Sequence, residues 1–389
     1  MFKSLRDLIQ NKRNQMEDWI ENFRNGRGWP IFMSLDIRIS EFKIAHVDSN
    51  LFPAGFNNLS INGREMAIKL TKSFLEKYNF SKILLIAERN TKNKLYAHNI
   101  VTLKDIIKSA SGADVRISVL NGEGLEFAWE VAGTISKVDK NITIVEQGWT
   151  PDAIIMNNDL TSGMPDSLID INQNIFPSPY LGWFSRKKST HFEIYNRIVK
   201  EFSNHFGFDD FLISLRSEQV QNVDFRNKTG LESIFLKGKA MFYDIDNDYK
   251  NHKIDEKPYI FLKPNNGTFG MGVLEIRDLE HLSHINKKNR HSIDKIKDGQ
   301  KTSCVILQEG VQTSFSFLNY PAEKIIYSAN GEIVDIMVRY NQHSNNHGNL
   351  GKSGALIEAL DTPIEFDIEW LINKLANLAA IEELAYVKQ

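Results

Sequence analysis

Residues 259–277 read YIFLKPNNGTFGMGVLEIR, and they carry the strongest indication of the architecture. An apolar run delivers Lys263 to its end, Pro264 interrupts it, and a loop containing Gly267, Gly270 and Gly272 leads into a second apolar run. Glycines let a backbone approach phosphate closely and present its amides, and a lysine adds a positive charge. The spacing matches neither the dinucleotide fingerprint nor the Walker loop. It predicts a flap over a nucleotide between two sheets; a glycine-rich hairpin with an exposed lysine is the alternative.

Downstream of this loop, three more apolar runs predict strands at 303–310, 323–329 and 332–340, which together with 259–263 and 272–277 indicate one sheet. Asn330-Gly331 joins the last two runs and is a strong hairpin signal. The run at 303–310 ends in Gln308 and Glu309, which suit a hinge that holds adenine and ribose. On the last strand, Asp335 and Arg339 share a face, where the arginine could neutralise phosphate charge or simply form an ion pair.

The first half alternates short apolar runs with helical patterns, which is typical of an α/β layer. Strands are expected at 84–88, 115–120, 142–147 and 153–159, and the segments 88–93 and 157–163 are candidate binding loops. We place a boundary near residue 200. It separates an N-terminal α/β substrate-binding domain, 1–200, from a nucleotide-binding region, 201–389.

Polar residues are dense between Ser34 and Ser60, and both signs of charge occur there. A cation could take the α-carboxylate of an amino acid and an aspartate its ammonium group. A solvated loop is the alternative. The candidate substrate-binding residues are Asp36, Arg38, Lys43, Asp48, Asn50, Asn57 and Asn58, together with Arg186 from a second cationic cluster that includes Lys187, Lys188 and His191.

Metal-binding signals are sparse. Asn349 can offer an amide oxygen to Mg²⁺, although the stretch around it, NNHGNLGKSG, lacks the glycine that a Walker loop needs. Asp244, Asp246 and Asp248 resemble the start of a calcium loop, but Tyr249 replaces the required glycine. A single cysteine, Cys304, excludes an intramolecular disulfide and a cysteine-cluster metal site.

Composition limits the class of protein. The 389 residues contain 47 Lys and Arg against 49 Asp and Glu, which argues against a protein that binds nucleic acid through bulk positive charge. We see no apolar run long enough for a membrane helix and no signal-peptide core, so a cytoplasmic protein is expected.

Taken together, KPNNGTFGMGV, LQEGV and the hairpin that ends in Arg339 resemble the nucleotide site of ATP-grasp ligases. The motifs VDSNLFPAGFNNL, MNNDLTSG and GWFSRKKSTHF extend the resemblance, which is closer to a bacterial glutamate–cysteine ligase family of that fold. It implies ATP- and Mg²⁺-dependent joining of the γ-carboxyl of glutamate to the amine of cysteine, through γ-glutamyl phosphate.

The resemblance also implies roles for individual residues. Lys263 and the amides between Gly267 and Gly272 would contact phosphates, and Arg339 would stabilise the transferring phosphoryl group. Asn349 would bind magnesium with an acid chosen among Asp335, which we favour, Glu323 and Glu309. The adenosine pocket would be lined by Gln308, Glu309 and Val311.

Two alternatives stay open at this point. One is an ATP-grasp ligase with another amine acceptor, since cysteine differs from serine or alanine by one small group. The other is a nucleotide-binding protein that has lost catalysis, because the stretch before Asn349 lacks the expected acid. A homo-oligomer also stays open.

Overall fold

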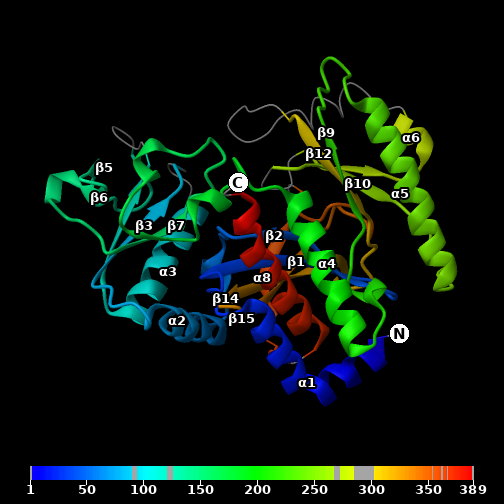
Figure 1. Ribbon diagram of the computed structural model, residues 1–389, viewed down its shortest axis with the longest axis horizontal. Coiled ribbons are helices and arrows are strands. Elements are labelled where there is room, and N and C mark those ends of the chain that lie inside the picture. The colour runs from blue at the N-terminus through cyan, green and yellow to red at the C-terminus, as the bar shows by residue number, and fades with distance from the viewer. Residues whose placement is uncertain are drawn as a thin grey trace.

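The computed structural model describes residues 2–89, 94–120, 126–266, 272–283, 302–352, 354–360, 362–365 and 367–387. Its centre is a main sheet of antiparallel strands in the order β16-β15-β14-β1-β2, with β13 paired to β14 (Figure 1). These strands are β1 (Phe32–Ile39), β2 (Ile44–Asn50), β13 (Ser316–Phe317), β14 (Tyr320–Ala329), β15 (Glu332–Tyr340) and β16 (Leu356–Ala359).

Two smaller layers flank the main sheet on opposite sides in Figure 1. The second sheet is antiparallel, in the order β11-β10-β12-β9, and packs with α5 (Leu231–Asn251) and α6 (Leu279–Ser283). Its strands are β9 (Ser217–Gln221), β10 (Ile260–Pro264), β11 (Leu274–Ile276) and β12 (Cys304–Glu309).

The third sheet is parallel, in the order β4-β3-β7-β8, with α3 (Lys94–Ser111) packed on α2 (Ile61–Leu75) beside it. Its strands are β3 (Lys82–Ala87), β4 (Asp114–Val119), β7 (Ala153–Asn157) and β8 (Asn174–Phe176). A separate hairpin joins β5 (Ile135–Val138) to β6 (Asn141–Ile144), and short 3₁₀ turns are η1 (Phe56–Asn58), η2 (Val145–Gln147), η3 (Asp166–Leu168), η4 (Pro179–Leu181) and η5 (Asp210–Leu212).

The C-terminal helix α8 (Ile368–Val387) is apolar on all sides over most of its length, a pattern that belongs in a protein interior. It lies against α1 (Phe2–Arg24), α4 (Lys188–Phe206) and the main sheet, and its alanines and leucines up to Ala380 are buried in the largest core. One face of the main sheet is thereby covered by helices from both ends of the chain. The other face is partly covered by α2 and is otherwise free to line a cavity.

Most of the expected strands are present, and β15 has the predicted bounds. Asn330 and Gly331 both have positive φ, 50° and 78°, as a tight hairpin turn requires. The strand expected at 142–147 ends at Ile144 and continues as η2. The aspartates of the rejected calcium loop lie on α5, which confirms that they do not form an EF-hand loop.

Two expectations are corrected. The strands of the second half belong to two sheets, not one, because β14–β16 pair with one another and with β1. The segment from Ser34 to Asn50 is not a solvated loop, which was the alternative to a binding segment, because it contributes β1 and β2 to the main sheet. The boundary near residue 200 therefore does not coincide with a break between sheets.

No described helix combines the length and the apolar composition that crossing a bilayer requires.

Candidate active site

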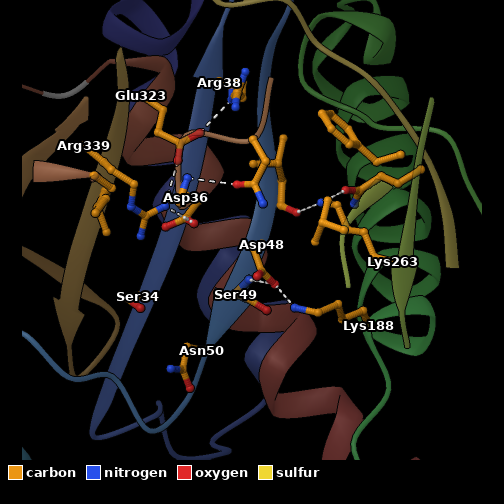
Figure 2. A pocket seen from close by; sticks show the side chains of 18 of the residues that line it. Ser34, Asp36, Arg38, Asp48, Ser49, Asn50, Lys188, Lys263, Glu323 and Arg339 are labelled. Atoms are coloured by element: carbon orange, nitrogen blue, oxygen red, sulfur yellow. Dashed lines mark hydrogen bonds and ion pairs between the residues drawn. The ribbon is translucent and has the colours of Figure 1, made fainter. Parts of the chain in front are cut away.

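A cavity of about 370 Å³ lies between the exposed part of the main sheet and the second sheet. It is lined by polar side chains from both sheets and by the N-terminal end of α4, as Figure 2 shows. The lining residues include Ser34, Asp36, Arg38, Asp48, Ser49, Asn50, Trp183, Lys188, Lys263, Gln308, Glu309, Val311, Glu323, Tyr327, Arg339 and Asn349. Strand periodicity explains the main-sheet set, because alternate residues of β1 and β14 face the same side.

Arg339 is the centre of a buried charge cluster on the main sheet. One of its terminal nitrogens, Nη1, lies 2.6 Å from Asp36 and 2.7 Å from Glu323. Arg38 contacts the other oxygen of Glu323 at 2.7 Å and donates to the carbonyl of Gly348. The cluster therefore ties β1, β14 and β15 to the loop that carries Asn349.

The two carboxyl groups of this cluster differ in pKa. Burial raises the pKa of Asp36 despite its contact with Arg339. Burial also opposes ionisation of Glu323, but Arg38 and Arg339 together outweigh it and lower the pKa of that carboxyl. Asp36 is thus the acid whose burial is not fully offset by its one arginine partner, and a further cation would stabilise its ionised form.

Lys263 reaches the cavity from β10 on the second sheet. Its ammonium group donates to the side chain of Gln308 and, at 3.2 Å, to the carbonyl of Val47. Burial lowers the pKa of Lys263 to about 8. The Nε2 group of Gln308 is buried and has no hydrogen-bond partner among the described residues.

A β-bulge in β2 shapes the next part of the wall. Asp36 pairs with Asp48 and Ile37 with His46, which leaves Val47 as the extra residue. The bulge turns Val47 and Asp48 toward the cavity, where Asp48 forms an ion pair with Lys188 at the start of α4. The pKa of Asp48 is lowered overall. Burial opposes ionisation of this carboxyl, but the positive charges of Lys188 and Lys263 outweigh the effect of burial.

Asn349 lines the cavity, and its side-chain oxygen accepts a hydrogen bond from the amide of Gly351 at 2.9 Å. Among the described residues there is no group of three His, Cys, Asp or Glu side chains placed to hold a metal. Asp36, Glu323 and Asn349 are the oxygen donors that line the cavity at this side. They fit a magnesium ion that coordinates few protein groups and keeps several waters.

The structure corrects the choice of Asp335 as a metal ligand. Asp335 shares a face with Arg339, as predicted, but α2 covers its end of the strand. Its carboxylate accepts from the amide and hydroxyl of Ser60, both at 2.8 Å, and Ser60 caps α2 through the amide of Gly63. Asp335 therefore holds a helix on the sheet and does not line the cavity.

Four more predicted substrate residues lie away from the cavity wall. Lys43 is buried against Glu309 at 2.7 Å, and Arg186 is buried against Glu383 at 2.6 Å. Asn57 and Asn58 belong to η1 and contact each other. Each of these polar side chains has a protein partner, so its chemistry serves the fold.

The remaining predictions divide as follows. Asp36, Arg38, Asp48 and Asn50 all line the cavity, as do Gln308, Glu309 and Val311. Gly272 has a positive φ of 71°, while Gly267 and Gly270 lie outside the described residues. The described residues of the two candidate binding loops, 88–93 and 157–163, do not line this cavity. The side chain of Asn157 instead donates to the carbonyl of Pro53, next to Ala54 on the cavity wall.

Sequence reasoning missed Lys188, Ser34, Trp183 and Tyr327. Lys188 stands in the cationic cluster from which Arg186 was chosen, and nothing in the local pattern separates the two. Lys188 reaches the cavity because α4 begins at this residue and directs the Lys188 side chain toward Asp48.

The fold is a mixed α/β architecture in which a polar cavity lies between two antiparallel sheets, with Lys263 and Gln308 on one side and Arg339 among carboxylates on the other. The model of the glutamate–cysteine ligase family matches residues 6–379, and the chain belongs to that family. It is therefore an enzyme of the ligase class.

A solved structure from Methylobacillus flagellatus KT, assigned as a gamma-glutamylcysteine synthetase, is 28% identical, with a TM-score of 0.87 over 98% of this chain and 96% of that chain. A glutathione synthetase-like effector from Globodera pallida is 10% identical, with a TM-score of 0.42 over 90% and 81% of the two chains. D-alanyl-alanine synthetase A from Vibrio cholerae is 10% identical, with a TM-score of 0.41 over 80% and 82%. No curated protein matches significantly.

Proposed function

We propose that the chain joins the γ-carboxyl of L-glutamate to the amine of L-cysteine at the expense of ATP, forming γ-glutamylcysteine. The observation that supports this most is the convergence of three kinds of group on one cavity. Lys263 and Gln308 suit a nucleotide, Arg339 with its carboxylates suits phosphoryl transfer, and the Asp48–Lys188 pair suits an amino acid.

The nucleotide lies at the end formed by the second sheet. Lys263 contacts its phosphates and the side chain of Gln308 donates through its unpartnered Nε2 group. Glu309 is held by Lys43 and by the amide of Arg216, so its carboxylate is oriented before a ligand arrives. Val311 adds an apolar contact for the base.

Arg339 stabilises the phosphoryl group during its transfer from ATP to the γ-carboxylate of glutamate. A carboxylate oxygen forms the new bond to phosphorus, and the bond to the ADP oxygen breaks. The amine of cysteine, in its neutral form, then attacks the activated carbonyl carbon. Phosphate leaves with the electron pair of the broken C–O bond and takes the proton that the amine loses. The protein's part is to position the reactants and to neutralise charge, and no covalent protein group is required.

Magnesium fits beside Asp36, Glu323 and Asn349, since these side chains bring carboxylate and amide oxygens to the cavity wall. When bound, it would neutralise phosphate charge. The residues that would hold it are Asn349 and the two acids.

The Asp48–Lys188 pair is complementary to a zwitterion. Lys188 binds the α-carboxylate of an amino-acid substrate, and Asp48, whose lowered pKa keeps it ionised, accepts from its ammonium group. The side chain of Asp48 remains 39% exposed, so it is accessible from the cavity. A reaction that consumes ATP and yields a free thiol suits the cytoplasm.

The test is ADP release by the purified protein with ATP and Mg²⁺, given glutamate and cysteine singly and then together, with product mass measured in parallel. Release that needs both amino acids and yields the mass of γ-glutamylcysteine is expected. ADP release with serine or alanine but not with cysteine would mean that cysteine is not the amine acceptor. ATP binding without turnover with any acceptor would contradict the proposal and favour a nucleotide-binding protein that has lost catalysis.

A further inference from the structure

Behind the bulge of β2 lies a buried chain of polar side chains that the proposed reaction does not use. His46 on β2 and His191 on α4 contact each other through their Nε2 atoms at 2.7 Å. His191 contacts Glu383 on α8 through Nδ1, and Glu383 also accepts from Arg186 at 2.6 Å. Every member is at most 2% exposed.

The chain ends on the cavity wall. Nδ1 of His46 lies 3.1 Å from the carbonyl of Asp48, and Arg186 donates to both the carbonyl and the hydroxyl of Ser49. Because β2 is the edge strand of the main sheet, these side chains supply hydrogen bonds that a further strand would otherwise provide.

The partners fix the protons of the two imidazoles. A carbonyl only accepts, so Nδ1 of His46 carries a proton, and a carboxylate only accepts, so Nδ1 of His191 carries one too. The two Nε2 atoms then face each other at hydrogen-bond distance and need one proton between them. Two neutral imidazole rings carry two N–H protons in total, whereas this hydrogen-bond geometry requires three.

Burial works against that third proton, so it is the hydrogen-bond geometry that calls for it. Glu383 supplies the negative charge; burial opposes its ionisation, but Arg186 and His191 outweigh it and lower its pKa to about 2. Burial lowers the pKa of His46 well below its usual value, and the neighbouring His191 lowers it further. Burial also lowers the pKa of His191, although Glu383 acts in the opposite direction. Arg186 also lies 3.4 Å from Nδ1 of His191, a weaker contact than those it makes with Glu383 and Ser49.

We propose that His46 and His191 share one proton in a buried relay anchored by Glu383, and that this relay is a positioning device that holds Asp48 and Ser49 at the substrate cavity. The positioning part rests on the proposed function, since it assigns Asp48 to an amino-acid substrate. The proton-sharing part depends on the geometry alone.

The first measurement is proton NMR on the full chain labelled with ¹⁵N-histidine. A proton resonance far downfield of the amide region, coupled to histidine nitrogen, is expected for the wild type and for His205→Gln, a control on an exposed site of α4. The resonance should vanish in His46→Asn, because asparagine keeps a donor near Nδ1 and has nothing at Nε2. Its absence in the wild type, with both rings singly protonated, would overturn the shared proton.

The second measurement is steady-state kinetics with each substrate varied. His46→Ala should raise KM for one amino acid at least tenfold and leave kcat and KM for ATP within threefold. His46→Asn should recover most of the loss, since it can still hold the carbonyl of Asp48. A fall in kcat at unchanged KM would indicate only a smaller folded fraction and would overturn the positioning role. Wild-type turnover in the same assay reports separately on the proposed function.

Discussion

Arg339 on β15 and Glu323 on β14 are direct partners in the main sheet, and Nη1 of Arg339 lies between Glu323, at 2.7 Å, and Asp36, at 2.6 Å. The guanidinium thus bridges two carboxylates that the register places on adjoining strands. This arrangement fixes the arginine before any substrate binds, and preorganised charge is what phosphoryl transfer requires.

Arg339→Lys should lower kcat by about 100-fold, because a lysine cannot keep both carboxylate contacts and offer charge to a phosphoryl group. Steady-state ADP release measures the effect. Arg64→Lys is the matched control, since Arg64 forms an exposed pair with Asp105. A kcat for Arg339→Lys within threefold of the wild-type value would contradict a role for Arg339 in phosphoryl transfer.

Lys263 should give the enzyme an alkaline limit. Its pKa of about 8 means that the ammonium form is lost as the pH rises through 8, so kcat/KM for ATP should fall above that pH.

The free energy of unfolding should respond to Lys263 in the opposite direction. Between pH 8 and the unfolded value near 10.5 the unfolded chain binds more protons, so this group makes the free energy of unfolding rise with pH.

Lys263→Arg checks this assignment. Arginine stays charged, so the limb near pH 8 should disappear in the profile of kcat/KM against pH. Persistence of the limb in the variant would assign it to another group.

Lys188→Met should raise KM for an amino-acid substrate at least about tenfold, since losing a charged hydrogen bond costs roughly 1.5–3 kcal/mol. Lys187→Met is the matched control, because Lys187 is the exposed neighbour and does not line the cavity. Equal kinetics for the two variants would argue against a substrate role for Lys188.

Asn349→Ala should raise the magnesium concentration needed for half-maximal turnover, since it removes an oxygen donor from the cavity wall. Asn346→Ala serves as the control because that side chain is exposed and only the backbone carbonyl of Asn346 is used. An unchanged magnesium requirement in Asn349→Ala would place the ion elsewhere.

Asp335 should matter for stability and not for magnesium. Asp335→Ala leaves the amide and hydroxyl of Ser60 without their acceptor, which costs about 1–3 kcal/mol in urea unfolding. Gly63→Ala should also destabilise, although alanine favours helices, because its Cβ would lie 2.2 Å from Asp335. A changed magnesium requirement in Asp335→Ala would restore the metal role.

Much of the candidate site was predictable. Lys263, Gln308 and Arg339 follow from strand ends and from alternation, which are properties of short windows, and all three line the cavity. Lys43 and Arg186 could not be separated from true cavity residues. Their contacts with Glu309 and Glu383 span 266 and 197 positions of sequence, and no local pattern encodes such pairs.

The sequence by itself determined the local elements: the strand after Tyr259, the tight turn at Asn330-Gly331 and the strands on either side of that turn. These depend on propensity, turn chemistry and periodicity, which act over a few residues. Only the tertiary structure decided that β1 and β2 join β14–β16, that Asp36 and Glu323 meet Arg339, and that α2 covers Asp335. Pairing and coverage depend on burial and hydrogen bonding between distant segments, and the contact between Arg38 and Glu323 alone joins positions 285 residues apart.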